Sequence, residues 1–184
     1  AGHSVSKTFT IDKNAPTIKN VEEGKYYKNV TPIVEDENLD TVKLYRIVGK
    51  TKLQVLTYKN GDAITTDGKY EIVATDKAGN KTIVTNFTVD ATAPEIVLID
   101  KIEAIQGDLI PIKPIIRESN MESVVLEKQN LLGKYEKVEN YTFEQKNGYV
   151  QGSQIKDHGK YRLTATDKAG NQTISEFEID NKAP

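Results

Sequence analysis

The heptapeptide Ala-Thr-Asp-Lys-Ala-Gly-Asn occurs twice in this chain, at residues 74–80 and again at residues 165–171. The similarity extends outward, because the Gly-Lys-Tyr of residues 68–70 recurs at residues 159–161. Self-similarity of this length indicates two copies of one structural unit, and a repeat limits the folds that a chain can adopt more than its composition does. We therefore expect the chain to fold as two similar modules.

A second marker, Asp-x-x-Ala-Pro, ends at Pro16, Pro94 and Pro184. These prolines lie 78 and 90 residues apart, and each interval is the size of a small β-sandwich. The marker and its spacing predict one domain over 16–93 and a second over 94–184 with a downstream linker. Residues 1–15 are interpreted as the last strand and linker of a preceding repeat, because residues 9–12 match residues 87–90 and 177–180.

Alternating apolar and polar residues, rich in β-branched and aromatic side chains, predict strands throughout. No segment of ten or more residues shows a helical period, so both domains are predicted to be all-β with about seven strands each. In the first repeat the expected strands lie near 17–21, 30–35, 41–48, 53–58, 62–66, 69–75 and 81–89.

The sixth expected strand of each repeat, which is described first for the second repeat, starts with a specific pattern. Asp157, Gly159 and Tyr161 have the spacing of a tyrosine corner, in which a tyrosine hydroxyl bonds back to nearby backbone. Tyr70 follows a similar pattern that is one residue tighter. The chain contains no cysteine and no tryptophan, so its domains must be held by aliphatic packing without a disulfide.

Together these motifs resemble the bacterial immunoglobulin-like repeats found in tandem on secreted and cell-wall proteins, especially those of Gram-positive bacteria. The resemblance covers essentially the whole chain, twice. It implies two tandem immunoglobulin-like β-sandwiches in an extracellular array. The second repeat has about a dozen extra residues, most of them between Asn120 and Gly159, so the loops of the two repeats need not share a role.

Composition excludes several classes of function. The 25 basic and 27 acidic side chains leave a net charge of -2, which offers no polybasic surface for nucleic acid. No apolar run approaches the ~20 residues that membrane insertion requires. With no cysteine and only two histidines, the residues for thiol catalysis or a histidine-rich metal site are missing. We therefore expect a non-enzymatic monomer with no cofactor other than calcium, whose first partners are the neighbouring domains of its own chain.

Two groups of acidic residues are candidate calcium ligands. In an immunoglobulin-like sandwich the linker, the first loop and the last loop meet at the end where the chain enters. That arrangement gathers carboxylates suited to a cation that takes six to eight oxygen ligands. The favoured alternative is that Asp76 and Asp167 fix the turns that follow them by accepting backbone hydrogen bonds. The candidates are Asp12, Asp36 and Asp76 in the first repeat and Asp90, Glu118 and Asp167 in the second.

Residues 131–150 of the second repeat carry aromatic side chains that could bind a host glycan or protein. Tyr135 and Tyr149 are the candidate ligand-binding residues. The favoured alternative is that Tyr141 and Phe143 face the core and that Asn147-Gly148 closes an ordinary hairpin.

The sequence favours an architectural function. We expect a spacer in a secreted or surface-anchored bacterial protein that positions a catalytic or adhesive domain. The competing hypothesis is an adhesin-type recognition module that acts through the second domain. An exposed apolar patch on residues 131–150 would favour recognition, and its absence would favour the spacer.

Overall fold

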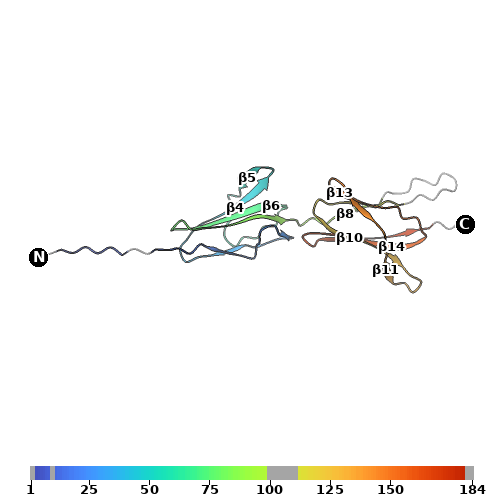
Figure 1. The fold of residues 1–184 in the computed structure, drawn as a ribbon, viewed down its shortest axis with the longest axis horizontal. Coiled ribbons are helices and arrows are strands. Elements are labelled where there is room, and N and C mark those ends of the chain that lie inside the picture. Colours follow the sequence, from blue (N-terminus) through green and yellow to red (C-terminus); the bar gives the residue numbers. More distant parts are fainter. Residues whose placement is uncertain (1–2, 9–10, 99–111, 181–184) are drawn as a thin grey trace. The chain divides into compact units, whose positions relative to one another are not determined.

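The computed structural model describes residues 3–8, 11–98 and 112–180. Within these residues every regular element is a β-strand (Figure 1), and no helix there is long and apolar enough to cross a membrane. The chain divides into two compact units, Ala1–Asp90 and Ala91–Pro184. Residues 9–10, in the predicted remnant of a preceding repeat, and residues 181–184, in the predicted downstream linker, lie outside the described residues.

The first unit contains a five-stranded sheet in the order β2-β7-β6-β4-β5 and a two-stranded sheet, β1-β3. All pairings are antiparallel except that of β2 with β7. Its strands are β1 (Thr17–Lys19), β2 (Tyr26–Tyr27), β3 (Ile33–Glu35), β4 (Leu39–Val48), β5 (Thr51–Gln54), β6 (Gly68–Asp76) and β7 (Lys81–Val89).

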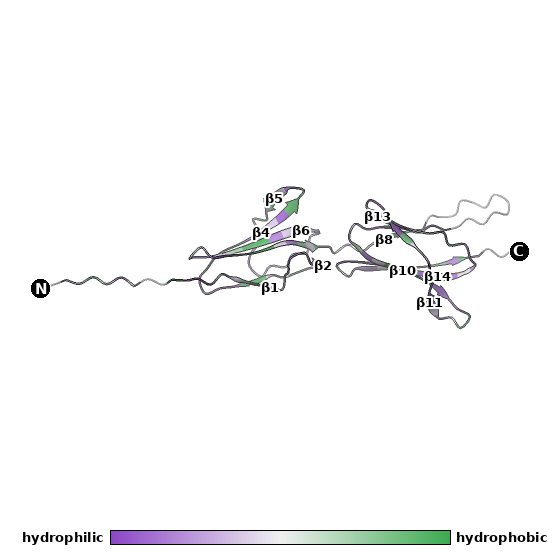
Figure 2. Ribbon diagram, viewed as in Figure 1, coloured by the Kyte–Doolittle hydropathy of each residue, from purple (hydrophilic) through white to green (hydrophobic). Residues whose placement is uncertain are grey.

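The core of the first unit lies between these sheets, because alternate residues of strands such as β3 and β6 point inward. In β6 the side chains of Tyr70, Ile72 and Ala74 are buried, and Phe87 of β7 packs on Tyr70 with its ring centroid 5.9 Å away. Val34 of β3 contributes from the other sheet. Figure 2 shows the resulting mixture of apolar and polar residues along the strands.

The second unit has two four-stranded antiparallel sheets, in the orders β11-β10-β14-β15 and β12-β13-β9-β8. Both sheets contribute to its core, which contains Ile116 and Val150 from one and Leu126 and Leu163 from the other. The described strands are β8 (Glu95–Val97), β9 (Ile115–Arg117), β10 (Met121–Gln129), β11 (Tyr135–Lys137), β12 (Phe143–Gln145), β13 (Tyr149–Gly152), β14 (Gly159–Asp167) and β15 (Gln172–Ile179).

These layers confirm the predicted immunoglobulin-like β-sandwich fold. The expectation that aliphatic packing alone holds the domains is wrong, because Tyr70, Phe87 and Tyr161 are buried in the cores as well. Ile72 and Leu163, each two residues beyond a corner tyrosine, are fully buried in their respective units. They occupy the place that a disulfide cysteine takes in antibody domains. Packing of branched aliphatic side chains therefore replaces the covalent link.

The tyrosine corner is confirmed in both units. The Tyr70 hydroxyl donates to the carbonyl of Thr66 at 2.8 Å, and the Tyr161 hydroxyl donates to the carbonyl of Asp157 at 2.9 Å. The acceptor is four residues upstream in each case. The tighter spacing in the first repeat therefore leaves the hydrogen bond unchanged.

Two expected strands of the first unit differ from those observed. Residues 62–66 form no strand, because only Ile64 pairs, as an isolated bridge to Val30. The expected strand at 53–58 is displaced to Thr51–Gln54, since a turn closed by the Tyr58 N–H on the carbonyl of Val55 follows it. The sequence analysis also missed β2, which has two residues and shows no alternation.

Candidate functional site

The turn between β6 and β7 is fixed by Asp76 and Asn80. One carboxylate oxygen of Asp76 accepts the Asn80 backbone N–H at 2.8 Å, and the other accepts the Asn80 side-chain amide at 2.7 Å. The Asp76 N–H donates to the Asn80 carbonyl, and Gly79 between them has a positive φ of 90°. This is the turn-fixing role that the sequence analysis favoured for Asp76.

Asn80 also holds the segment that leads into the first unit. Its side-chain amide lies 3.1 Å from the carbonyl oxygen of Asp12 and 3.2 Å from that of Asn14. Pro16 is buried, and the Thr82 hydroxyl donates to its carbonyl at 2.5 Å. The entry segment is therefore bound to the body of the unit, and we call this contact the asparagine clamp.

The second unit repeats the arrangement. Asp167 accepts the backbone N–H and the side-chain amide of Asn171, each at 2.8 Å. The same amide lies 3.4 Å from the carbonyl of Thr92, which precedes Pro94 by two residues as Asn14 precedes Pro16. Pro94 is fully buried. Asn80 and Asn171 end the duplicated heptapeptide, so the motif encodes both the turn and the clamp.

The three acidic residues predicted for the first unit do come together. Asp12, Asp36 and Asp76 each offer a carboxylate oxygen within 4.8 Å of the others. Asn38 bridges two of them, since its side-chain amide donates to Asp12 at 3.0 Å and its backbone N–H donates to Asp36 at 2.7 Å. Spacing and oxygen chemistry both fit a hard cation such as calcium.

Hydrogen bonds already compensate part of this negative charge. Burial raises the pKa of the Asp76 carboxyl, but the Asn80 side chain and the backbone N–H groups of residues 78–80 outweigh it, so the pKa lies below its ordinary value. The hydrogen bonds of its own turn therefore favour the ionised form of the Asp76 carboxyl. The calcium hypothesis remains a prediction for this group.

In the second unit the carboxylates of Glu118 and Asp167 also lie within 4.8 Å of each other. Glu118 accepts the Asn120 backbone N–H at 2.6 Å, and Asp167 is almost fully buried. Asp90 is the last residue of the first unit, where it is buried and its N–H donates to the carbonyl of Tyr27.

Tyr135 lies on β11, at the edge of the sheet β11-β10-β14-β15. The Arg162 guanidinium stands 4.4 Å from its ring centroid, and Arg162 also donates to Glu127 at 2.7 Å. This is a cation–π contact on the outer face of the sheet. One face of the Tyr135 ring is therefore already in contact with a side chain of its own unit.

Tyr149 lies on β13, in the other sheet of the second unit. Its neighbour Val150 is buried, so alternation directs Tyr149 away from the core. Tyr135 and Tyr149 thus lie on different sheets and do not line one surface. The structure therefore replaces the expected single aromatic hairpin with two hairpins, β10–β11 and β12–β13.

The favoured alternative for the remaining aromatics is confirmed. Tyr141 and Phe143 pack against the core with ring centroids 4.9 Å apart, and the Tyr141 hydroxyl donates to the carbonyl of Ser153 at 2.5 Å. Gly148 has a φ of 79° in the turn between β12 and β13. The sequence therefore placed this hairpin correctly.

Sequence reasoning missed Leu131 and Leu132. Both side chains are fully exposed, at 106% and 92% of their reference area, in the turn between β10 and β11. Asn130 holds this turn rigid, because its side-chain oxygen accepts the N–H groups of Leu132 and Lys134, each at 3.0 Å. The sequence signal that could have indicated these residues is the pair of adjacent leucines within 131–150, the segment already considered for ligand binding.

No family model matches the chain. It is 39% identical over 85 residues to an outer cell wall protein of Brevibacillus brevis, and the aligned part is 46% of this chain and 8% of that protein. The chain therefore spans a small fraction of that relative.

Three solved structures are similar at low identity. Murine CEACAM1b is 17% identical, with 90% of this chain and 98% of that chain covered and a TM-score of 0.42. The fibronectin(III)-like modules of Clostridium thermocellum CbhA are 17% identical, with 89% and 92% covered and a TM-score of 0.33. The titin domains Z1Z2, solved with telethonin, are 17% identical, with 91% and 96% covered and a TM-score of 0.29.

Proposed function

We propose that this chain is a non-catalytic spacer segment of a bacterial cell-surface protein, where it positions a catalytic or adhesive domain. The observation that carries the proposal is the asparagine clamp. Asn80 and Asn171 each bind the segment that leads into their own unit. A spacer needs entry segments that do not swing freely, and the clamp supplies that restraint in both repeats.

The clamp restrains backbone that would otherwise be a flexible linker. Fixing the backbone of one residue costs about 1–2 kcal/mol of conformational entropy. The hydrogen bond from the clamp asparagine and the burial of the nearby proline help to offset that cost. The proline also fixes its own φ near −65°. Clamp and proline together favour one path of the chain into each unit.

A surface location is supported by the relative. The outer cell wall protein of Brevibacillus brevis shares 39% identity over 85 residues with this chain. The absence of cysteine suits a module whose stability does not depend on the redox state of its surroundings. We extend the location, and not any activity, from that protein to this chain.

Distance measurements between the two units test the spacer. Because the chain has no native cysteine, spin labels can be attached at Lys50→Cys and Lys137→Cys, two exposed positions in different units. We expect a narrow distance distribution that broadens in Asn171→Ala, which removes the contact of the Asn171 amide with the Thr92 carbonyl. Asn147→Ala, in an exposed hairpin turn, is the matched control and should leave the distribution unchanged. A wild-type distribution as broad as that of a flexible linker would contradict the spacer.

Recognition through the second unit is the second candidate function, and the exposed Leu131 and Leu132 favour it. Rigid display of two leucines lowers the entropy cost of inserting them into an apolar pocket of a partner protein. Binding to a panel of immobilised host glycans and matrix proteins, lost in Leu131→Ser with Leu132→Ser, would support it. Leu56→Ser is the control, since Leu56 is a single exposed leucine of the first unit. Signal lost only in Tyr135→Ala and Tyr149→Ala would favour the aromatic residues instead.

A further inference from the structure

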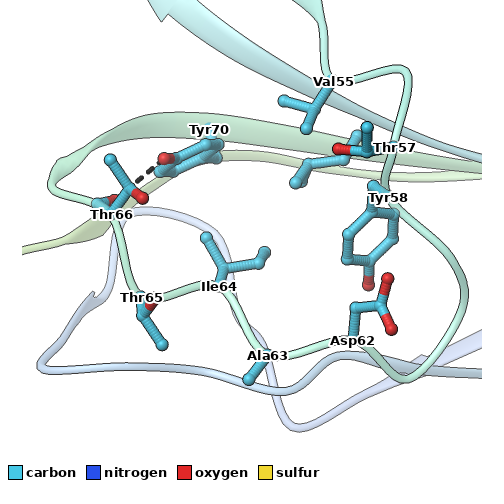
Figure 3. A pocket seen from close by; sticks show the side chains of 10 residues that line it. Val55, Thr57, Tyr58, Asp62, Ala63, Ile64, Thr65, Thr66 and Tyr70 are labelled. Atoms are coloured by element: carbon cyan, nitrogen blue, oxygen red, sulfur yellow. Dashed lines mark hydrogen bonds between the residues drawn. The ribbon is translucent and has the colours of Figure 1, made fainter.

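A cavity of about 170 Å³ opens in the first unit beside residues 55–67, the segment that joins β5 to β6. Figure 3 shows the side chains that line it. Leu44, Val55 and Ile64 provide apolar walls, and Ile64 is buried. The rim is polar and exposed, and it includes Thr57 and Thr65. The cavity therefore combines an apolar floor with hydroxyl groups at its mouth.

Tyr58 places an unusual group in this cavity. Its hydroxyl oxygen is buried and has no hydrogen-bond partner. Burial, and then the Asp62 carboxylate, raise the pKa of Tyr58 to about 12, so the hydroxyl keeps its proton at neutral pH. Figure 3 shows the hydroxyl directed toward Asp62, which is an exposed side chain. An unpaired buried hydroxyl is costly, so this group calls for an explanation, and a ligand that accepts a hydrogen bond from it would provide one.

The second unit offers a direct contrast. Burial likewise raises the pKa of Tyr141 to about 12, but its hydroxyl donates to the carbonyl of Ser153. Both tyrosines are partly buried and pack on their own core clusters. Of these two hydroxyls, that of Tyr58 lacks a hydrogen-bond partner, and it lies at the cavity, where a ligand could accept its hydrogen bond.

The segment that carries Tyr58 and Asp62 is held in place from both ends. The Lys59 N–H donates to Asp62 Oδ2 at 2.8 Å, and the Asp62 N–H donates back to the Lys59 carbonyl at 3.0 Å. The Asn60 side chain accepts the Val34 N–H at 2.9 Å and donates to the Val34 carbonyl at 2.8 Å. The backbone of such a loop is already ordered, so it loses little entropy on binding.

Cavity size and lining limit the ligand. A dry cavity of about 150 Å³ is known to hold a benzene ring, so this one suits a single six-membered ring. The apolar floor matches the C–H face of such a ring, and the carboxylate with the threonine hydroxyls matches hydroxyl groups around its edge. Asp62 would repel a carboxylate on the ligand.

We propose that this cavity binds one neutral sugar residue, with the Tyr58 hydroxyl and the Asp62 carboxylate as its hydrogen-bond partners. The exposed Asp62 side chain gives up its hydrogen bond from the Lys59 N–H and rotates to uncover the Tyr58 hydroxyl, which then donates to a sugar oxygen. Asp62 accepts from a sugar hydroxyl, and the ring packs over the apolar floor. The site lies in the first unit and does not depend on the spacer role or on recognition by the second unit.

The test is a titration of the full chain with glucose, N-acetylglucosamine and glucuronate, followed by backbone amide chemical shifts. We expect saturable shifts confined to residues 55–67 and their β4 neighbours for at least one neutral sugar. A ligand of this size should bind with a Kd in the millimolar range. Absence of saturable shifts for both neutral sugars, or shifts centred elsewhere, would overturn the proposal, and so would glucuronate that binds as tightly as glucose.

Three variants sharpen the test. Tyr58→Phe keeps the ring and should weaken binding about fivefold, the effect of one hydrogen bond. Asp62→Asn should weaken binding and reduce the discrimination against glucuronate. Tyr141→Phe is the control and should leave sugar binding unchanged.

Stability gives an independent readout of the same hydroxyl. Because Tyr58 has no partner, Tyr58→Phe should leave the melting temperature unchanged or raise it, whereas Tyr141→Phe should lower it. If Tyr58→Phe lowers the melting temperature as much as Tyr141→Phe does, the hydroxyl is already satisfied, for example by a bound water, and the proposal fails. This measurement decides the question even if Asp62→Asn does not fold.

Discussion

The side-chain amide nitrogen of Asn80 lies 3.2 Å from the carbonyl oxygen of Asn14, across 66 residues of sequence. The contact joins the end of the duplicated heptapeptide to the residue that lies two before Pro16, the last residue of the Asp-x-x-Ala-Pro marker. Asn171 and Thr92 stand in the same relation in the second unit. One short motif therefore specifies a turn and also the attachment of the segment that enters the domain.

Asn80→Ala and Asn171→Ala should each destabilise the chain. Each removes an amide that satisfies a buried carboxylate and holds a linker carbonyl, and such losses cost about 1–3 kcal/mol. Chemical denaturation of both variants measures the change. Asn147→Ala, at an exposed turn, should fall within about 0.5 kcal/mol of wild type. Equal stability of Asn80→Ala and wild type would show that the clamp contributes nothing to folding.

The tyrosine corner predicts a pair of matched effects. Tyr70→Phe and Tyr161→Phe keep rings that stack on Phe87 and Phe177, so they lose only the hydrogen bonds to the Thr66 and Asp157 carbonyls. Each should lower the free energy of unfolding by about 1 kcal/mol, as measured by denaturant midpoints at constant m-value. A change in only one of the two would mean that the tighter spacing in the first repeat matters after all.

Much of the fold was readable from the sequence because the repeats align on strongly patterned strands. In the first unit the strand that carries the corner tyrosine and the final strand are long, and the bounds expected for them, 69–75 and 81–89, agree within one residue with β6 and β7. The core positions Ile72 and Leu163 followed from the tyrosine pattern. The two-residue strand β2 could not be predicted, since its pairing with β7 depends on tertiary position and not on alternation.

The site was less predictable for the same physical reason. The grouping of Asp12, Asp36 and Asp76 followed from fold geometry, because loops at one end of a sandwich converge. The separation of Tyr135 from Tyr149 did not, since β13 joins the other sheet by pairing with the distant strand β9, where Tyr149 lies opposite Arg117. The unpaired Tyr58 hydroxyl is invisible in sequence, where every tyrosine looks alike.

Asp76 should make stability depend on acid pH. Its pKa lies below the ordinary value of 3.8 in the folded chain, so the folded state holds its proton less tightly than the unfolded state does. Its contribution to stability is complete above the ordinary pKa and is lost as the pH falls through the folded pKa. In Asp76→Asn the free energy of unfolding should be lower at neutral pH and should decline less between about pH 4 and pH 2. An acid limb as steep as that of the wild type would assign the pH dependence to other carboxylates.

We propose finally that calcium binds the group formed by Asp12, Asp36 and Asp76, whose carboxylate oxygens lie within 4.8 Å of one another. A cation that binds only the folded chain raises its melting temperature by mass action. With the affinity typical of extracellular modules, about 1 mM calcium should raise it by a few degrees. Asp36→Asn is the informative variant, because Asp36 supplies a ligand but takes no part in the Asp76–Asn80 turn, so it should abolish the calcium response and leave the calcium-free stability nearly unchanged. A melting temperature that is the same in millimolar calcium and in EDTA would leave these carboxylates with the structural role that their hydrogen bonds already define.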